Sequence, residues 1–273
     1  MYFSLDGRIY TNEEEHQVSV YSEGLNFGFG VFETLRVYHN RLIDFHMHFE
    51  RLKRDSGQVG LRLSVDEATL HQWAMAVVAV QGKQEAALKI LHYKDRENTR
   101  ILITMRDYPY KKADFEKGYN VKFSQVQRHS QNPIYQIKSM NYMNNIVLKR
   151  TLEKGVDELL FLNEKEEVTE GIFTNFFIVK ENKILTPDLQ SGLLNGIIRR
   201  NILQYAMEIG YFIEETNLTK EDVLSAEEAF FTNALVGIMP IKSIEDKVFD
   251  LENNRVTSIL EKNLFERMDS VHG

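Results

Sequence analysis

Lys138 lies in the stretch QIKSMNYMNN, residues 136–145, where a strand is predicted to give way to a helix. Such a junction holds a side chain firmly. An amine kept in a partly desolvated pocket has a lowered pKa and can form a Schiff base with a carbonyl group. Most lysines, however, are solvated surface charges, so Lys138 by itself indicates no function.

Three more features of the second half of the chain fit the same chemistry. Glu170 ends a predicted strand in VTEGIF, and Gly171 after it permits close backbone approach. Gly196, in LLNGIIRR, begins an amphipathic helix whose first N–H groups would bind a phosphate. Asn233 and Ala234 follow the apolar run AFF at a strand end. An amine, a carboxylate and a phosphate site are what pyridoxal phosphate needs, although a solvated turn carboxylate and an ordinary helix start remain alternatives for Glu170 and Gly196.

The elements that position these residues are predicted to form two α/β lobes. The first is a small N-terminal α/β domain over residues 1–107, with a hairpin at Asp6-Gly7. A polar linker with one proline covers residues 108–118. The larger C-terminal domain, residues 119–273, has closely spaced short strands that indicate an antiparallel sheet or barrel with flanking helices. Helices are predicted over 44–54, from a capping box at Ser64 to Val78, and over 142–152, 197–209, 219–224 and 256–268.

Composition excludes several classes of protein. The chain has 273 residues, of which 43% are hydrophobic, and this is typical of a soluble globular protein. A net charge of −7 without a basic stripe argues against a nucleic-acid partner. The absence of cysteine excludes disulfides and thiolate metal sites and fits a reducing compartment. No signal peptide or run long enough to span a membrane is found, so we expect a cytoplasmic protein with no membrane partner.

Other motifs fail on their spacing. Gly24, Gly28 and Gly30 do not match a dinucleotide fingerprint, and they lead into a strand where a helix would be required. His46 and His48 are two residues apart on a predicted helix and do not share a face, so we predict no metal site.

Six motifs together resemble the fold-type IV pyridoxal-phosphate enzymes, the class IV aminotransferase family. They cover nearly the whole chain in the family's order: FGFGVFETLRV (27–37), HFERL (48–52), IKSMNYMNN (137–145), VTEGIFTNFF (168–177), LLNGIIRR (193–200) and TNALVGIMP (232–240). The resemblance implies an α/β fold of the α+β type with two lobes, and pyridoxal 5'-phosphate as the cofactor. It also implies a small-molecule amino substrate and a homodimer.

The resemblance also implies roles for individual residues. Lys138 resembles the Schiff-base lysine, which acts as general base, and Glu170 the partner of the pyridine nitrogen. Arg51 in HFERL matches a phosphate-binding arginine, and Tyr142 a tyrosine that supports the cofactor's phenolic oxygen. The remaining matches lie around the phosphate: Gly196, the backbone N–H groups of Ile197 and Ile198, and Asn233 and Ala234. Without the resemblance, Arg51 would be interpreted as a surface ion pair and Tyr142 as a core aromatic.

The subfamily is less sharply defined. KSMNYMNN lacks the residue that branched-chain aminotransferases insert before Asn-Tyr, whereas NALVGIMP, TRILITMRDYP and QNPIYQIK are most similar to aminodeoxychorismate lyase. We therefore expect a lyase that releases 4-aminobenzoate and pyruvate in folate synthesis, with Arg100 or Arg106 as the substrate-carboxylate residue. A D-amino acid or branched-chain-type transaminase is the alternative, and a binding protein that keeps the fold without activity is a remote one. Two departures affect the substrate pocket: a short turn at 94–99, and Phe29 where the family has aspartate.

Overall fold

The computed structural model describes residues 2–11 and 18–270. The chain divides into two compact units by its internal contacts. The first contains residues 1–109 together with 137–142, and the second contains residues 110–136 and 143–273. The division after Pro109 falls inside the predicted linker, part of which is helix α4 (Lys112–Lys117). Segment 137–142 packs with the first unit, whereas the sequence pattern assigned it to the second.

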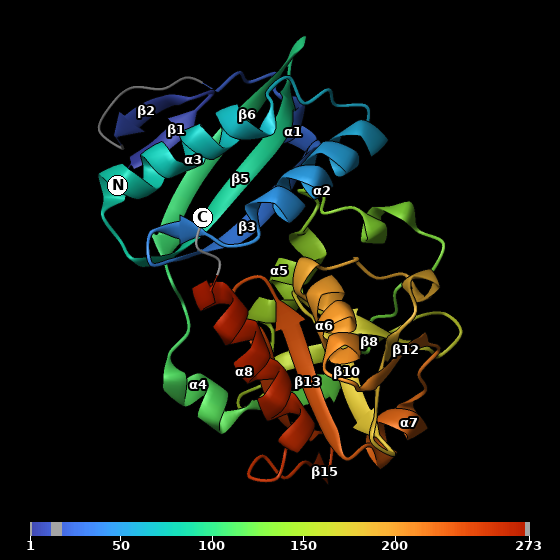
Figure 1. The fold of residues 1–273 in the computed structure, drawn as a ribbon. Helices are drawn as coiled ribbons and strands as arrows, with labels where there is room; N and C mark the ends of the chain where they lie inside the picture. Colours follow the sequence, from blue (N-terminus) through green and yellow to red (C-terminus); the bar gives the residue numbers. More distant parts are fainter. Residues whose placement is uncertain (1, 12–17, 271–273) are drawn as a thin grey trace. The chain divides into compact units, whose positions relative to one another are not determined.

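The first unit is a six-stranded sheet with two helices on one face (Figure 1). Helix α2 (Phe45–Gln58) and helix α3 (Glu67–Gln81) contribute apolar side chains to a core that includes Leu35, Leu52 and Leu88. Helix α3 begins at the cap Asp66, two residues after the predicted Ser64. The short helix α1 (Glu23–Phe27) was not predicted. In spatial order the strands are β2 (Arg8–Thr11), β1 (Tyr2–Leu5), β6 (Asn98–Asp107), β5 (Glu85–Asp95), β3 (Gly30–Tyr38) and β4 (Arg41–Leu42).

The second unit contains a closed ring of six strands. The ring runs β10, β13, β14, β7, β8, β9 and closes where Asn175 of β10 pairs with Glu170 of β9. The ring strands are β7 (Tyr119–Phe123), β8 (Glu158–Leu162), β9 (Val168–Gly171), β10 (Asn175–Lys180), β13 (Glu228–Asn233) and β14 (Gly237–Ile244). The additional strands are β11 (Lys183–Pro187), β12 (Phe212–Thr216) and β15 (Lys247–Val248). This ring confirms the predicted barrel-like sheet.

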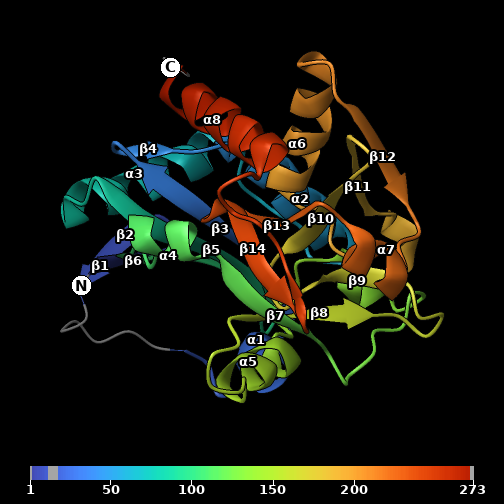
Figure 2. The same ribbon diagram turned by 90° about the horizontal axis from the view of Figure 1, so that it is seen from below.

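Helices cover the barrel of the second unit. Helix α6 (Ile197–Glu208) and helix α8 (Arg255–Ser270) lie side by side next to β13 (Figure 2). The remaining helices are α5 (Met143–Arg150), α7 (Lys220–Ser225) and the short 3-10 helices at Pro133–Gln136 and Leu189–Ser191. The predicted α/β class of the α+β type, with flanking helices, is confirmed. Within the described ranges, no helix has both the length and the apolar character needed to cross a bilayer.

Candidate functional site

Lys138 lies in a segment that is added to the edge of strand β3. Ser139 forms an isolated antiparallel bridge with Val31. The Phe32 N–H donates to the Lys138 carbonyl (2.9 Å), and the Met140 N–H donates to the Gly30 carbonyl (2.8 Å). A 3-10 helix precedes this segment and α5 follows it, so the predicted junction of a regular strand with a helix is wrong in its first half. Lys138 is instead held by strand-like pairing to a distant part of the chain.

The Lys138 side chain is half-buried against two aromatic rings of the first unit. Its Nζ lies 4.7 Å from the centroid of Phe32 and 5.6 Å from that of Tyr142. Phe32 and Tyr142 themselves meet edge to face at 4.9 Å. Among the residues that the structure describes, none hydrogen-bonds to this amine or forms an ion pair with it. An amine that is placed among rings without a carboxylate partner fits the Schiff-base role.

Cations gather on the sheet face that carries Phe32. Lys89 of β5 lies 4.5 Å from the Phe32 ring centroid, and on the next strand Thr104 pairs with Lys89 while Arg106 pairs with Ala87. The pKa of Lys89 is lowered by burial and then by the charges of Lys138 and Arg106. Neither Lys89 nor Arg106 has a carboxylate partner in the part of the chain that is described. This face therefore attracts an anion.

The two predicted substrate-binding arginines differ in their surroundings. Arg106 is exposed and belongs to the cationic face. Arg100, near the start of the same strand, forms an ion pair with Asp6 in which Nε and Oδ2 are 2.6 Å apart. Asp6 belongs to the β1–β2 turn, so this ion pair ties the turn to β6. Arg106 is thus the better placed of the two for a substrate near Lys138.

Arg51 belongs to a buried charged cluster beneath the same sheet. Its Nε and Nη2 each donate to a carboxylate oxygen of Glu33 at 2.7 Å, and His48 Nδ1 is 2.6 Å from Glu33 Oε2. Burial would raise the pKa of Glu33, but Arg51 and His48 outweigh it and lower the pKa to about 2. The pKa of His48 is lowered, mainly by burial and against the attraction of Glu33. Arg51 is consequently fixed from below by a bidentate carboxylate.

In the second unit, Glu170 is buried at the end of β9, where the barrel closes. One carboxylate oxygen accepts from Arg128, and the other accepts from Asn175 Nδ2 (3.0 Å) and the Leu194 N–H (3.1 Å). The Arg128 guanidinium also stacks on the Phe161 ring, with Cζ 4.4 Å from its centroid. These contacts fix the orientation of the Glu170 carboxylate, the group that the resemblance assigns to the pyridine nitrogen of the cofactor.

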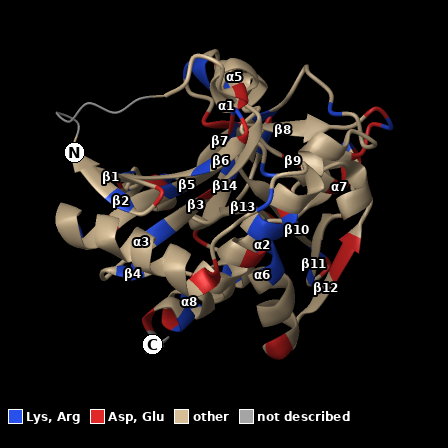
Figure 3. Ribbon diagram, turned by 90° about the horizontal axis from the view of Figure 1, so that it is seen from above, with Lys and Arg blue, Asp and Glu red and all other residues tan. Residues whose placement is uncertain are grey.

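The N-terminus of α6 has a glycine cap that is tightly packed. Gly196 is its cap and provides no side-chain hydrogen bond, while Ile197 and Ile198 of the first turn are buried. A Cβ atom at Gly196 would lie 2.0 Å from Asn175 Oδ1, so there is no room for a side chain. The helix is anchored by Arg199, which donates to the Pro187 carbonyl (2.9 Å) and to Glu215 Oε2 (2.6 Å) on β12. Figure 3 marks basic residues of α6 in blue and acidic residues of β12 in red. This geometry fits the predicted phosphate role of Gly196 and the two isoleucine N–H groups.

Asn233 shapes the turn after β13. Its Oδ1 accepts from the N–H groups of Leu235 (2.8 Å) and Val236 (2.9 Å), and its Nδ2 donates to the Phe173 carbonyl (3.3 Å). The side chain thus holds the turn that contains Ala234. The neighbouring Thr232 hydroxyl is buried and has no partner within the described ranges.

The predicted residues are divided between the units. Arg51, Lys138 and Tyr142 belong to the first, and the second contains Glu170, Gly196, Ile197, Ile198, Asn233 and Ala234.

Sequence reasoning missed Glu33, Lys89 and Arg128. Glu33 and Lys89 lie inside strands β3 and β5, and the alternation of side chains along a strand would have assigned each to one face of the sheet. Nothing in the sequence showed which residue each would contact. Arg128 lies in an irregular stretch, outside every named strand and helix.

The chain is similar to known proteins over most of its length. Residues 30–244 match the family described as amino-transferase class IV. A probable branched-chain-amino-acid aminotransferase of Thermotoga maritima is 31% identical, with 85% of this chain and 84% of the relative covered. The aminodeoxychorismate lyase of Bacillus subtilis is 28% identical over 94% of this chain and 91% of its own. The branched-chain aminotransferase of Thermoproteus uzoniensis, solved with norvaline, has a TM-score of 0.88 at 28% identity, with 97% and 94% of the two chains covered.

The chain belongs to the class IV aminotransferase family. It is a pyridoxal-phosphate-dependent enzyme, as the six motifs predicted. Its relatives include both aminotransferases and a lyase, so membership alone does not define the reaction.

Proposed function

We propose that this enzyme is an aminodeoxychorismate lyase, which cleaves its substrate to 4-aminobenzoate and pyruvate. The observation that favours this reaction is the cationic face around Lys138, formed with Lys89 and Arg106. Aminodeoxychorismate has two carboxylates, and a face with several unpaired cations suits such a dianion better than a branched aliphatic side chain. The similarity to the lyase of Bacillus subtilis adds support.

The residues of the chain supply binding and proton transfer in this reaction. The cofactor, when bound, draws electrons from the carbon that bears the substrate nitrogen. Lys138 removes the proton from that carbon, and Glu170, held as a carboxylate by Arg128, favours the protonated ring nitrogen. The C–O bond to the enolpyruvyl group then breaks, and the released enolpyruvate takes up a proton to become pyruvate. Arg51, Gly196, Ile197 and Ile198 are proposed to hold the phosphate, Asn233 and Ala234 to flank it, and Tyr142 to contact the phenolic oxygen.

The first experiment supplies aminodeoxychorismate to the purified, pyridoxal-phosphate-loaded protein without a keto acid. We expect pyruvate and 4-aminobenzoate in equal amounts. Replacing Lys89 by Met should raise KM by roughly tenfold or more, because a charge-assisted contact is lost. Lys83→Met is the matched control, since Lys83 pairs with the exposed Asp107. Absence of pyruvate, together with transfer from an amino acid to 2-oxoglutarate, would overturn the lyase proposal.

A transaminase is the second candidate, and the similarity to two branched-chain aminotransferases favours it. In a transaminase no C–O bond breaks after the proton has been removed. Lys138 would instead deliver that proton to the bound cofactor. Both reactions require the Schiff base. Borohydride should therefore fix the cofactor on Lys138 in either case, and a protein that binds no pyridoxal phosphate would contradict both.

We also propose a cytoplasmic homodimer. Four apolar side chains are highly exposed within eight residues of the first unit: Val20, Tyr21, Leu25 and Phe27. Exposed apolar side chains of this kind suit an interface, and a second copy is the partner that the family resemblance implies. Light scattering of the purified protein should give twice the chain mass of 31.9 kDa, and Phe27→Asp should shift it towards monomer. A monomeric wild-type protein would contradict the dimer.

A further inference from the structure

The backbone of Lys138 is held on both sides by groups far away in the sequence. Its carbonyl accepts from the Phe32 N–H of β3. Its own N–H donates to a side chain, the Asp55 carboxylate, with the nitrogen 2.9 Å from Oδ2. Strand β3 thus supplies one of the two bonds, and helix α2 supplies the other.

Asp55 is buried in helix α2 and its second oxygen is also used. Oδ1 accepts from Arg54 Nε (2.9 Å) and Nη2 (2.7 Å), and the Asp55 side chain is 1% exposed. The Arg54 side chain is 42% exposed. Arg54, which is partly exposed, therefore orients the buried carboxylate, and the other carboxylate oxygen accepts from the Lys138 N–H. A buried carboxylate that accepts a backbone N–H forms one of the stronger hydrogen bonds in a protein.

We propose that Asp55 is a positioning residue for Lys138. It fixes the peptide from which the lysine side chain extends, and thereby keeps the amine against Phe32 and Tyr142. The inference rests on the proposed Schiff-base role of Lys138, although the contact itself does not. Without Asp55 the Lys138 N–H would lose this partner. Segment 137–142 would keep its bonds to Gly30 and Phe32 of β3 and the bond from Asn141 Nδ2 to the Gly28 carbonyl.

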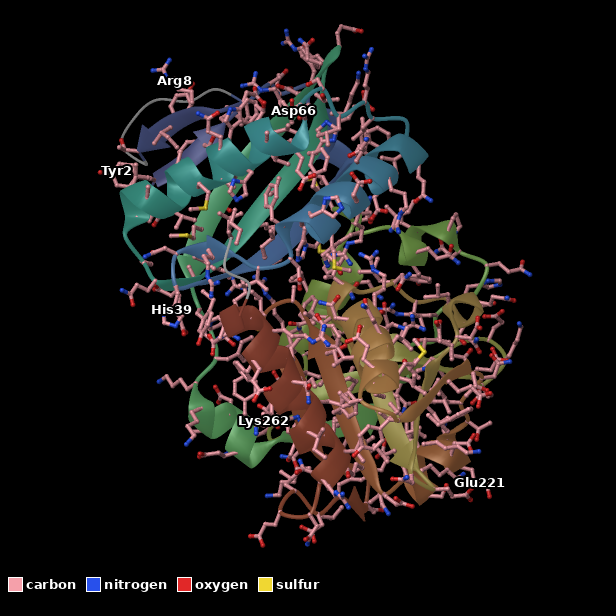
Figure 4. The ribbon with its side chains drawn as sticks, in the orientation of Figure 1. Tyr2, Arg8, His39, Asp66, Glu221 and Lys262 are labelled. Atoms are coloured by element: carbon pink, nitrogen blue, oxygen red, sulfur yellow. The ribbon has the colours of Figure 1, made fainter. Side chains whose placement is uncertain are left out.

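The experiment compares three variants with the wild type. Asp55→Ala removes the acceptor. Asp55→Asn keeps a carbonyl oxygen for the Lys138 N–H, while the half-exposed Arg54 can turn to water. Asp66→Ala is the matched control: Asp66 caps α3 in the same unit, where Oδ1 accepts from the Thr69 N–H at 2.8 Å (Figure 4). It therefore also removes one carboxylate–backbone bond, in a different part of the unit.

The first readout is amide hydrogen exchange of the apoprotein over residues 137–142. Asp55→Ala should speed exchange there by roughly ten- to a hundredfold, and Asp55→Asn should restore most of the protection. The second readout is the rate at which added pyridoxal phosphate forms its Schiff-base absorbance. Asp55→Ala should slow it by roughly tenfold and lower kcat more than it raises KM, whereas Asp66→Ala should change neither.

The outcomes separate this proposal from the proposed function. Unchanged exchange at 137–142 in Asp55→Ala would overturn the positioning role, whatever the enzyme does. Faster exchange with an unchanged rate of Schiff-base formation would also overturn it, because the contact would then be structural alone. If pyridoxal phosphate does not react with Lys138 in the wild type, the proposed function fails, and the exchange result still reports on the contact. If Asp55→Ala does not fold, Asp55→Asn against Asp55→Ser gives the same comparison, since the shorter serine hydroxyl does not reach the Lys138 N–H.

Discussion

At the scale of single residues, two buried acids of the first unit support candidate site residues from the side away from the cationic face. Arg51 rests on Glu33, and the Lys138 peptide on Asp55. Lys138 and Lys89 have no such acid partner among the described residues. The Arg51 charge is thus neutralised by a buried acid, whereas the charges of Lys138 and Lys89 are not.

Glu33→Gln tests the support of Arg51. The amide offers one acceptor in place of two and turns an N–H towards the guanidinium, so a buried cation loses its counter-charge. We expect the free energy of unfolding to fall by about 3–5 kcal/mol, as for other broken buried pairs, and the Kd for pyridoxal phosphate to rise. Denaturant unfolding and a fluorescence titration with the cofactor measure the two effects.

The matched control for this variant is Glu67→Gln, because Glu67 pairs with the exposed His46. It should change both quantities little. If Glu33→Gln behaves like this control, Glu33 does not support Arg51. The sign of the pH effect follows from the lowered pKa of Glu33: the stabilisation is present above pH 4.5 and is lost as the pH falls through about 2.

At the scale of elements, local sequence patterns predicted the hairpins, helix starts and strand ends that depend on residues close together in the sequence. The hairpin at Asp6-Gly7 and helix α6 after Gly196 follow from turn and helix signals, and the structure has both. Strand ends were predictable too, so Glu170 and Asn233 lie where the apolar runs indicated.

Pairings between distant segments could not be predicted in the same way. Segment 137–142 has no periodicity of its own, and its structure comes from Val31, Phe32 and Asp55, which are more than 80 residues away. Arg128 presents the same difficulty, because nothing near it in the sequence indicates Glu170 as its partner. The candidate cofactor residues were predicted from family motifs, while the residues that contact them, such as Arg128 and Asp55, required the structure.

At the scale of the whole molecule, a buried carboxyl group links stability to pH. Glu158, on β8 of the barrel, is 2% exposed, and burial raises its pKa to about 7. Its Oε1 accepts from the N–H groups of Leu159 (3.1 Å) and Ile172 (3.0 Å). These two bonds lower the pKa of Glu158, but burial outweighs them, so the folded state favours the protonated carboxyl group up to about pH 7.

Because its pKa is higher in the folded than in the unfolded chain, Glu158 contributes stability below pH 4.5, and this contribution is lost as the pH rises through about 7. The difference between these two pKa values corresponds to about 3 kcal/mol. Glu158→Gln keeps a carbonyl oxygen for both N–H groups and cannot ionise. Relative to the wild type, the variant should have nearly equal stability at pH 5 and be more stable by about 2–3 kcal/mol at pH 8.5. Denaturant unfolding of the variant and the wild type at each pH gives this difference in the free energy of unfolding. His48 and His92 titrate in both proteins, so their contributions cancel. A difference that stays constant between pH 5 and 8.5 would mean that Glu158 is already ionised in the folded barrel.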